Sequence, residues 1–139
     1  MEKTWRWFGK NDKITLTMLR QIGVEGIVTA LHDVPNGEIW TLEAINDLKE
    51  YIESYGLRWS VVECLPVCEA IKYGGPERDA LIEHYKVSLA NLGMAGVQTL
   101  DIHPVAYDKS VETVLLAHNI LHKPLAAVAW HAVDVVVCH

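Results

Sequence analysis

Short apolar runs alternate with longer amphipathic segments along the chain. The apolar runs occupy residues 4–8, 26–31, 57–63 and 97–102, and turn-forming or ionisable residues follow each of them. Runs of this length are typical of strands buried in a parallel sheet. The pattern therefore predicts four strands, and the Ala- and Val-rich residues 125–137 predict a fifth.

The segment after the first strand shows the spacing of a helix that packs on a core. Leu16, Leu19 and Ile22 recur at intervals of three residues, so one side of the helix is apolar. Asn11 and Asp12 precede them, and both residue types cap helix N-termini. We expect this helix to end at the following glycine.

Three further helices are predicted from the same kind of spacing. The first begins with Thr41 as its N-cap and ends before Gly56; the others occupy residues 77–92 and 110–122. The inward-facing positions of the first two are Leu42, Ile45, Leu48 and Ile52, and then Leu81, Tyr85, Ser88, Leu89 and Leu92.

Strands and helices that alternate in this way predict an α/β fold with a parallel sheet and right-handed crossovers. Two arrangements of such a sheet remain possible: an open doubly wound sheet, and part of a (β/α)8 barrel. A complete barrel typically needs ~250 residues, whereas this chain has 139, so the pattern alone favours the open sheet. No glycine-rich nucleotide-binding motif follows the first or second strand.

Composition narrows the classes of function. The formal net charge is −6 and Lys and Arg form no cluster, which disfavours a nucleic-acid or anionic-membrane surface. Three cysteines, Cys64, Cys68 and Cys138, make no disulfide framework and suit a reducing compartment. The N-terminus has no apolar stretch of signal-peptide length, and no run reaches the ~18 residues of a membrane span. We therefore expect a cytoplasmic protein.

Polar residues that can bind ligands or transfer protons follow every predicted strand. In parallel α/β folds, ligand-binding groups lie beyond the carboxyl ends of the strands. These positions hold Asn11 and Asp12, then His32 and Asp33, then Glu63 and Cys64, and finally Asp101 and His103. A purely structural domain does not need so many, so a binding or catalytic site is expected at this edge.

Structural roles compete with functional ones at these positions. His32 suits an acid/base role or a core histidine that bonds a carbonyl group. Glu63 closes an apolar strand, where a carboxylate is seldom buried without a partner, and this favours function. Asn11 is readily explained as a cap and Asp33 as a turn residue. Trp7 is mainly a core aromatic, although its place near a strand end also allows it to line a pocket.

The cysteines and the remaining histidines favour structural explanations. Cys64 and Cys68 are expected to be small buried residues, with no sign of an activated thiol. Asp101 and His103 lie two residues apart on one strand, but so short a motif arises easily by chance.

Several ordered segments resemble mannonate dehydratase. They are TWRWFG at residues 4–9, VTALH at 28–32, PNGEIW at 35–40 and GLRWSVVE at 56–63, followed by PV at 66–67, EAIK at 69–72 and NLG at 91–93. The similarity extends to about Thr99 and covers the four predicted strands.

The resemblance implies the first half of a (β/α)8 barrel of the xylose-isomerase-like type. This expectation takes the place of the open sheet that the pattern alone favours. It also implies a metal-dependent hydro-lyase that removes water from D-mannonate to give 2-keto-3-deoxy-D-gluconate in hexuronate breakdown, usually with Mn²⁺. Within a sugar-acid pocket, His32 and Glu63 become the candidate catalytic residues. Trp7, Asn11 and Asp33 become the candidate substrate contacts.

The resemblance stops after the fourth strand. Residues 100–105 depart from the family pattern, and the family's metal ligands lie in later strands, so no metal ligand is assigned to this chain. We expect a half-barrel over residues 1–104 and an unmatched helix–strand tail over 105–139. A half-barrel leaves strand edges unpaired, which predicts self-association. The chain alone is expected to have little activity, and a non-catalytic sugar-acid-binding or degenerate fragment is the alternative.

Overall fold

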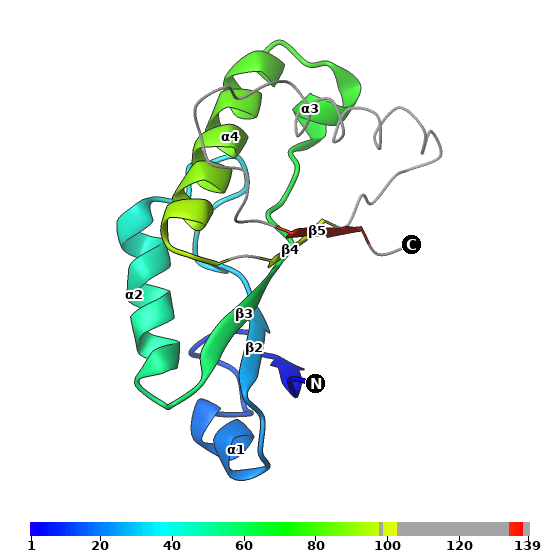
Figure 1. Ribbon diagram of the computed structural model, residues 1–139. Coiled ribbons are helices and arrows are strands. Elements are labelled where there is room, and N and C mark those ends of the chain that lie inside the picture. Colours follow the sequence, from blue (N-terminus) through cyan, green and yellow to red (C-terminus); the bar gives the residue numbers. More distant parts are fainter. Residues whose placement is uncertain (98, 103–133, 138–139) are drawn as a thin grey trace.

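The computed structural model describes residues 1–97, 99–102 and 134–137, which form a parallel sheet with helices packed on it (Figure 1). The strands are β1 (Thr4–Arg6), β2 (Gly26–Thr29), β3 (Arg58–Glu63), β4 (Thr99–Ile102) and β5 (Asp134–Val137). The helices are α1 (Leu16–Gln21), α2 (Leu42–Glu53), α3 (Glu69–Tyr73) and α4 (Arg78–Met94).

The strands lie in chain order, β1-β2-β3-β4-β5, and every neighbouring pair is parallel. A doubly wound sheet reverses its strand order at a switch point, and the described sheet has no such reversal. The doubly wound sheet favoured by the pattern alone is therefore wrong, and the parallel α/β class is confirmed. The predicted helix at 110–122 lies outside the described residues, and β5 is the last part of the predicted fifth strand.

The core lies between the sheet and the helices, and α2 and α4 lie side by side along one face of the sheet (Figure 1). Ile27 of β2 and Trp59 and Val62 of β3 point into this core. Strict alternation cannot bury residues 59 and 62 together, because side chains of a strand point to opposite faces in turn. The register resolves this: Ile27 pairs with Trp59 but Val28 pairs with Val61, so Ser60 is an extra residue in a bulge.

The predicted start of the first helix is corrected by the structure. α1 begins after Thr15, whose Oγ1 accepts a backbone N–H of the first turn at 3.3 Å, and not after Asn11 and Asp12. Asp12 closes the preceding loop instead, because its carboxylate accepts the backbone N–H groups of Phe8 at 2.9 Å and Ile14 at 3.0 Å. These bonds, the Phe8 one foremost, hold the pKa of the Asp12 carboxyl below its ordinary value.

The prediction for the second helix is confirmed. Thr41 caps α2 by accepting the backbone N–H of the residue three positions on at 3.2 Å, and Ile45 and Ile52 are fully buried. In α1, by contrast, Ile22 is exposed rather than inward-facing, because the helix ends at Gln21. The five-residue helix α3 was not predicted, since so short an element shows no periodicity.

The two described cysteines differ in their surroundings. Cys68 is buried, as predicted, whereas Cys64 is exposed with φ at +57°, a left-handed conformation uncommon outside glycine.

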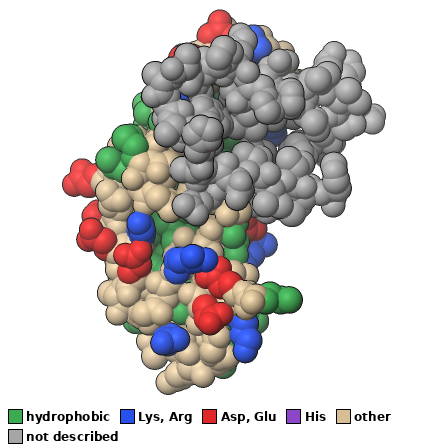
Figure 2. All heavy atoms as spheres, in the orientation of Figure 1, with side chains coloured by type: hydrophobic (Ala, Val, Ile, Leu, Met, Phe, Trp, Pro, Cys, Tyr) green, Lys and Arg blue, Asp and Glu red, His purple; other side chains and the backbone are tan. Residues whose placement is uncertain are grey.

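Acidic and basic side chains are intermixed over the face shown in Figure 2, below the residues drawn in grey. Among the residues that the structure describes, no helix has the length and apolar character to cross a membrane.

Candidate functional site at the carboxyl ends of the strands

An ion pair joins the carboxyl ends of β1 and β3. The register aligns Arg6 with Val28 and Val28 with Val61, so all three side chains share the sheet face opposite the helices. The bulge at Ser60 places Glu63 on this same open face. Arg6 Nε lies 2.5 Å from Glu63 Oε2 in an ion pair, and the Glu63 side chain is only 14% exposed. The expected partner of this half-buried carboxylate is therefore Arg6.

Two rings extend this ion pair towards β2. The Arg6 guanidinium lies 4.6 Å from the centre of the Phe8 ring, within cation–π range. The Phe8 ring in turn lies 6.4 Å from the His32 ring, tilted by 34°. Both Phe8 and His32 are exposed. Arg6, Phe8, His32 and Glu63, called here the carboxyl-end cluster, thus combine a cation, an apolar ring, an imidazole and a carboxylate.

Local contacts hold His32 in place after β2. Its backbone N–H donates to Ala30 O at 3.1 Å, which makes a tight turn directly after the strand. Its Nε2 lies 3.4 Å from Thr29 Oγ1, and the fully buried Thr29 hydroxyl also lies 2.6 Å from Trp7 O. The ring passes over Gly9, where a Cβ would be 3.5 Å from His32 Cδ2.

The other predicted substrate contacts lie elsewhere. Trp7 is 2% exposed and its ring stacks on Tyr51 of α2 at 6.2 Å, on the helix side of the sheet, because it follows Arg6 and points the opposite way. Asn11 and Asp33 are exposed in the loops after β1 and β2. The structure therefore brings His32 and Glu63 to the carboxyl-end cluster, places Trp7 in the core, and leaves the roles of Asn11 and Asp33 as predictions.

Sequence reasoning missed Arg6 and Phe8. A signal was available for Arg6, because it is the one charged residue within the aromatic run of residues 4–8 and its neighbours Trp5 and Trp7 share the other face. That alternation indicates a cation on the open face of the first strand. Phe8 gave no comparable signal, since an aromatic residue after a strand is common.

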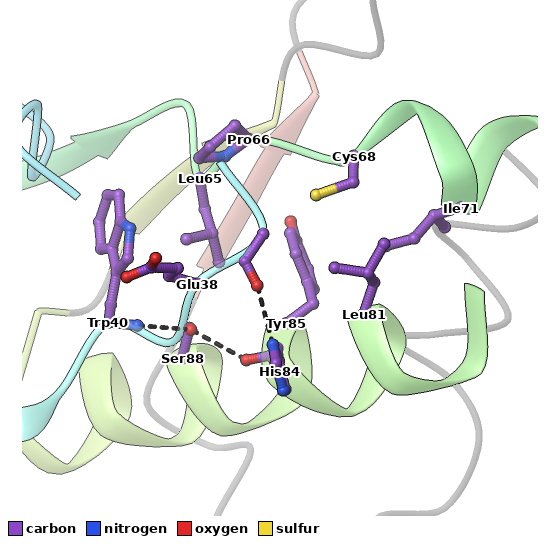
Figure 3. A pocket seen from close by; sticks show the side chains of 11 residues that line it. Glu38, Trp40, Leu65, Pro66, Cys68, Ile71, Leu81, His84, Tyr85 and Ser88 are labelled. Carbon is purple, nitrogen blue, oxygen red and sulfur yellow. Dashed lines mark hydrogen bonds between the residues drawn. The ribbon is translucent and has the colours of Figure 1, made fainter. Parts of the chain in front are cut away.

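Three polar residues of α4 hold the loop between β2 and α2. His84 Nδ1 donates to Gly37 O at 2.8 Å, Ser88 Oγ accepts the Trp40 N–H at 2.9 Å, and Asn91 Nδ2 donates to Trp40 O at 2.7 Å. The three residues follow each other at helical spacing and so share one side of α4. Figure 3 shows the first two of these bonds. The loop that follows the site histidine is thereby fixed to the helix layer.

A cavity lies beneath this loop, next to Cys68 and Tyr85 (Figure 3). Its volume of about 10 Å³ is close to that of one water molecule and far below that of a sugar-acid pocket. Burial raises the pKa of the Cys68 thiol, which donates a hydrogen bond to Asn36 Oδ1 at 3.0 Å. Burial also raises the pKa of the Tyr85 phenol far above its ordinary value. These neutral groups indicate a packing role and no nucleophile.

The described residues do not fit a manganese site. Within residues 1–97, 99–102 and 134–137, no three His, Cys, Asp or Glu side chains are close enough to hold a metal ion. A resident divalent metal typically needs several such ligands. The carboxyl-end cluster itself offers one imidazole and one carboxylate, and that carboxylate is already paired with Arg6.

Comparison with known proteins gives a consistent result. A sequence model described as D-mannonate dehydratase (UxuA) matches residues 1–107. Mannonate dehydratase from Marinomonas sp. (strain MWYL1) is 53% identical over 100 residues, which are 72% of this chain and 26% of that protein. The protein of the same name from Streptococcus suis (strain 05ZYH33) is 51% identical over 98 residues, 70% of this chain and 27% of its own length.

A solved structure shows the same similarity. The crystal structure of mannonate dehydratase from Streptococcus suis serotype 2 matches with a TM-score of 0.71 and 48% identity, over 76% of this chain and 31% of that one. The chain thus spans between a quarter and a third of the length of these relatives. The family match covers most of the chain and includes every residue of the carboxyl-end cluster, and so this chain belongs to the D-mannonate dehydratase family.

Proposed function

We propose that this chain provides one side of a sugar-acid site for a mannonate dehydratase, the hydro-lyase that converts D-mannonate to 2-keto-3-deoxy-D-gluconate. One observation carries the proposal: Arg6, His32 and Glu63 converge at the carboxyl ends of three adjacent parallel strands, in a member of that family. This edge is where α/β folds place their ligand-binding groups.

The carboxyl-end cluster has the groups that a polyhydroxy acid requires. The Arg6 side chain is 58% exposed, and the guanidinium nitrogens other than Nε remain able to donate to substrate oxygens. The second carboxylate oxygen of Glu63 can accept hydrogen bonds from hydroxyl groups. The exposed Phe8 ring gives an apolar surface for the carbon chain. His32 is the proposed acid/base group, since dehydration takes a proton from the carbon beside the carboxylate.

The strand order supports a wider proposal about the fold. Parallel strands that each lie beside the preceding one wind as a (β/α)8 barrel does, and we propose that β1–β4 are the first half of such a barrel. The Mn²⁺ implied by the family would then be held by ligands that the resemblance places in later barrel strands, and none of them is assigned to this chain. Pairing of exposed strand edges with a second copy, giving a homo-oligomer, belongs to the same proposal.

Substrate binding tests the role of the cluster, and the chain contains a matched control for Arg6. Arg58 also lies in a strand and pairs with a glutamate, Glu2, at 2.6 Å, but at the opposite, amino end of β3. Calorimetric titration should detect D-mannonate binding and give weaker or no binding of D-mannitol, which lacks the carboxylate. Arg6→Gln should weaken D-mannonate binding at least tenfold, while Arg58→Gln should leave it unchanged. Equal losses in both variants would contradict the proposed site.

A turnover assay distinguishes the lyase from the alternative function, that of a non-catalytic sugar-acid-binding fragment. The chain is incubated with D-mannonate and Mn²⁺, and 2-keto-3-deoxy-D-gluconate is followed over time. We expect little product from this chain alone, and His32→Ala should abolish what there is. Binding without any product would favour the non-catalytic sugar-acid-binding fragment. If neither binding nor product is observed, both functions are contradicted.

A further inference from the structure

We propose that Thr29 fixes the neutral tautomer of His32, so that His32 carries its hydrogen on Nε2 and presents Nδ1 as the proton acceptor. The assignment of the tautomer rests on geometry alone. The role of Nδ1 as a base towards a sugar acid rests on the proposed function. Thr29 acts here as a positioning residue, because it works through His32 and touches no substrate.

The hydrogen of the Thr29 hydroxyl is donated to a backbone carbonyl. Thr29 Oγ1 lies 2.6 Å from Trp7 O, and a backbone carbonyl can only accept, so the hydroxyl donates to it. A hydroxyl has a single hydrogen. Towards His32 Nε2, 3.4 Å away, Thr29 Oγ1 can therefore only accept. The contact is a hydrogen bond when Nε2 carries the hydrogen and is not one when Nε2 presents a lone pair.

A second contact shows which edge of the ring faces the protein. A Cβ on Gly9 would lie 3.5 Å from His32 Cδ2, so this carbon lies over the Gly9 backbone. Cδ2 and Nε2 are neighbours in the imidazole ring, and both are thus turned towards the β1 and β2 ends. Nδ1 lies on the other side of the ring, and the side chain as a whole is exposed. The free lone pair therefore faces away from Thr29.

The chemistry at Nδ1 follows from this orientation. A neutral imidazole with hydrogen on Nε2 has its basic lone pair on Nδ1. For D-mannonate, the proton on the carbon beside the carboxylate would pass to Nδ1, and the electron pair of that C–H bond would form a double bond to the next carbon. The bond from that carbon to its hydroxyl breaks, and the hydroxyl leaves as water with the proton from Nδ1. The resulting enol becomes the ketone.

His84 provides an internal contrast. Its Nδ1 lies 2.8 Å from Gly37 O, and because the carbonyl is an acceptor, His84 must carry its hydrogen on Nδ1 when neutral (Figure 3). The two described histidines are therefore expected in opposite tautomers. This makes His84 a built-in reference for any measurement on His32.

Nuclear magnetic resonance measures the tautomers directly. In the full chain labelled with ¹⁵N, long-range ¹H–¹⁵N correlation spectra at a pH where the imidazoles are neutral distinguish the protonated ring nitrogen from the bare one. His32→Gln and His84→Gln variants assign the signals. We expect the hydrogen on Nε2 of His32 and on Nδ1 of His84. A hydrogen on Nδ1 of His32 would overturn the inference.

Two substitutions test the role of Thr29. Thr29→Val removes the acceptor at nearly constant shape and should abolish the preference of His32 for the Nε2 hydrogen, whereas Thr29→Ser should keep it. Unchanged His84 signals show that each variant is folded. A His32 preference that survives in Thr29→Val would refute the positioning role. Addition of D-mannonate should shift the Nδ1 signal; absence of that shift would count against the proposed function and leave the tautomer assignment intact.

Discussion

Replacement of Ser88 by alanine tests how firmly α4 holds the loop that follows the site histidine. Ser88 is 1% exposed, and its Oγ makes two hydrogen bonds: it accepts the Trp40 N–H and donates to His84 O, both at 2.9 Å. Ser88→Ala removes the acceptor and leaves the buried Trp40 N–H without one. His84 O is less affected, since a carbonyl in a helix interior also accepts a backbone bond.

The magnitude follows from these contacts. A buried donor left without a partner costs about 1–3 kcal/mol. Alanine has a higher helix propensity than serine, by up to about 0.7 kcal/mol, which offsets part of that cost. We therefore expect Ser88→Ala to lower the free energy of unfolding by about 1–2 kcal/mol.

Ser54→Ala is the matched control. The Ser54 hydroxyl also donates to a nearby helix carbonyl, that of Tyr51 at 2.6 Å, but it is exposed and accepts no buried N–H. Its removal should change the free energy of unfolding by less than about 0.5 kcal/mol. Both variants are unfolded in urea with tryptophan fluorescence as the probe, which the buried Trp7, Trp40 and Trp59 make sensitive to unfolding. Equal effects of the two substitutions would refute the reasoning.

Three further predictions concern the sheet, a helix cap and the response to acid. Gly26→Ala should destabilise the protein by about 1–3 kcal/mol, because the new Cβ would lie 2.1 Å from Ser60 Oγ and 2.7 Å from Glu2 Oε1. Ser60→Gly in the same chain should restore part of this loss in urea unfolding, since it removes the shorter of the two contacts. Thr41→Ala should cost about 1 kcal/mol through loss of the α2 cap, measured in the same way. The hydrogen bond from Arg58 holds the pKa of the Glu2 carboxyl below its ordinary value. The pair therefore stabilises the protein fully above the ordinary pKa of a glutamate, and this contribution is lost as the pH falls through the lowered pKa. Glu2→Gln should weaken the fall in the free energy of unfolding at acidic pH, measured by urea unfolding at a series of pH values. An unchanged pH dependence would contradict the assignment.

The local elements were largely predictable from the sequence, because each depends on nearby residues. The apolar stripe of α2 and its Thr41 cap follow from spacing within one helix, and both are present. The cap of α1 was misplaced because Asp12 and Thr15 are both suitable capping residues. Only the folded loop shows that the Asp12 carboxylate is occupied by the N–H groups of Phe8 and Ile14.

The assembly of the site depends on long-range geometry that the sequence does not display. Arg6 and Glu63 lie on strands separated by β2, so their pairing requires both the strand order and the register. Strict alternation along β3 would put Glu63 on the same face as the buried Trp59. The bulge at Ser60 moves Glu63 to the open face, and an apolar pattern does not reveal a single extra residue.

The most direct test of the proposed site is a map of where D-mannonate binds. Backbone ¹H–¹⁵N spectra of the full chain are recorded as D-mannonate is added, and the shift of each assigned amide is followed. We expect the largest shifts at the carboxyl ends of the strands, at Arg6, Phe8, His32 and Glu63. Shifts concentrated instead at Glu2 and Arg58, at the opposite end of the sheet, or the absence of any shift, would contradict it.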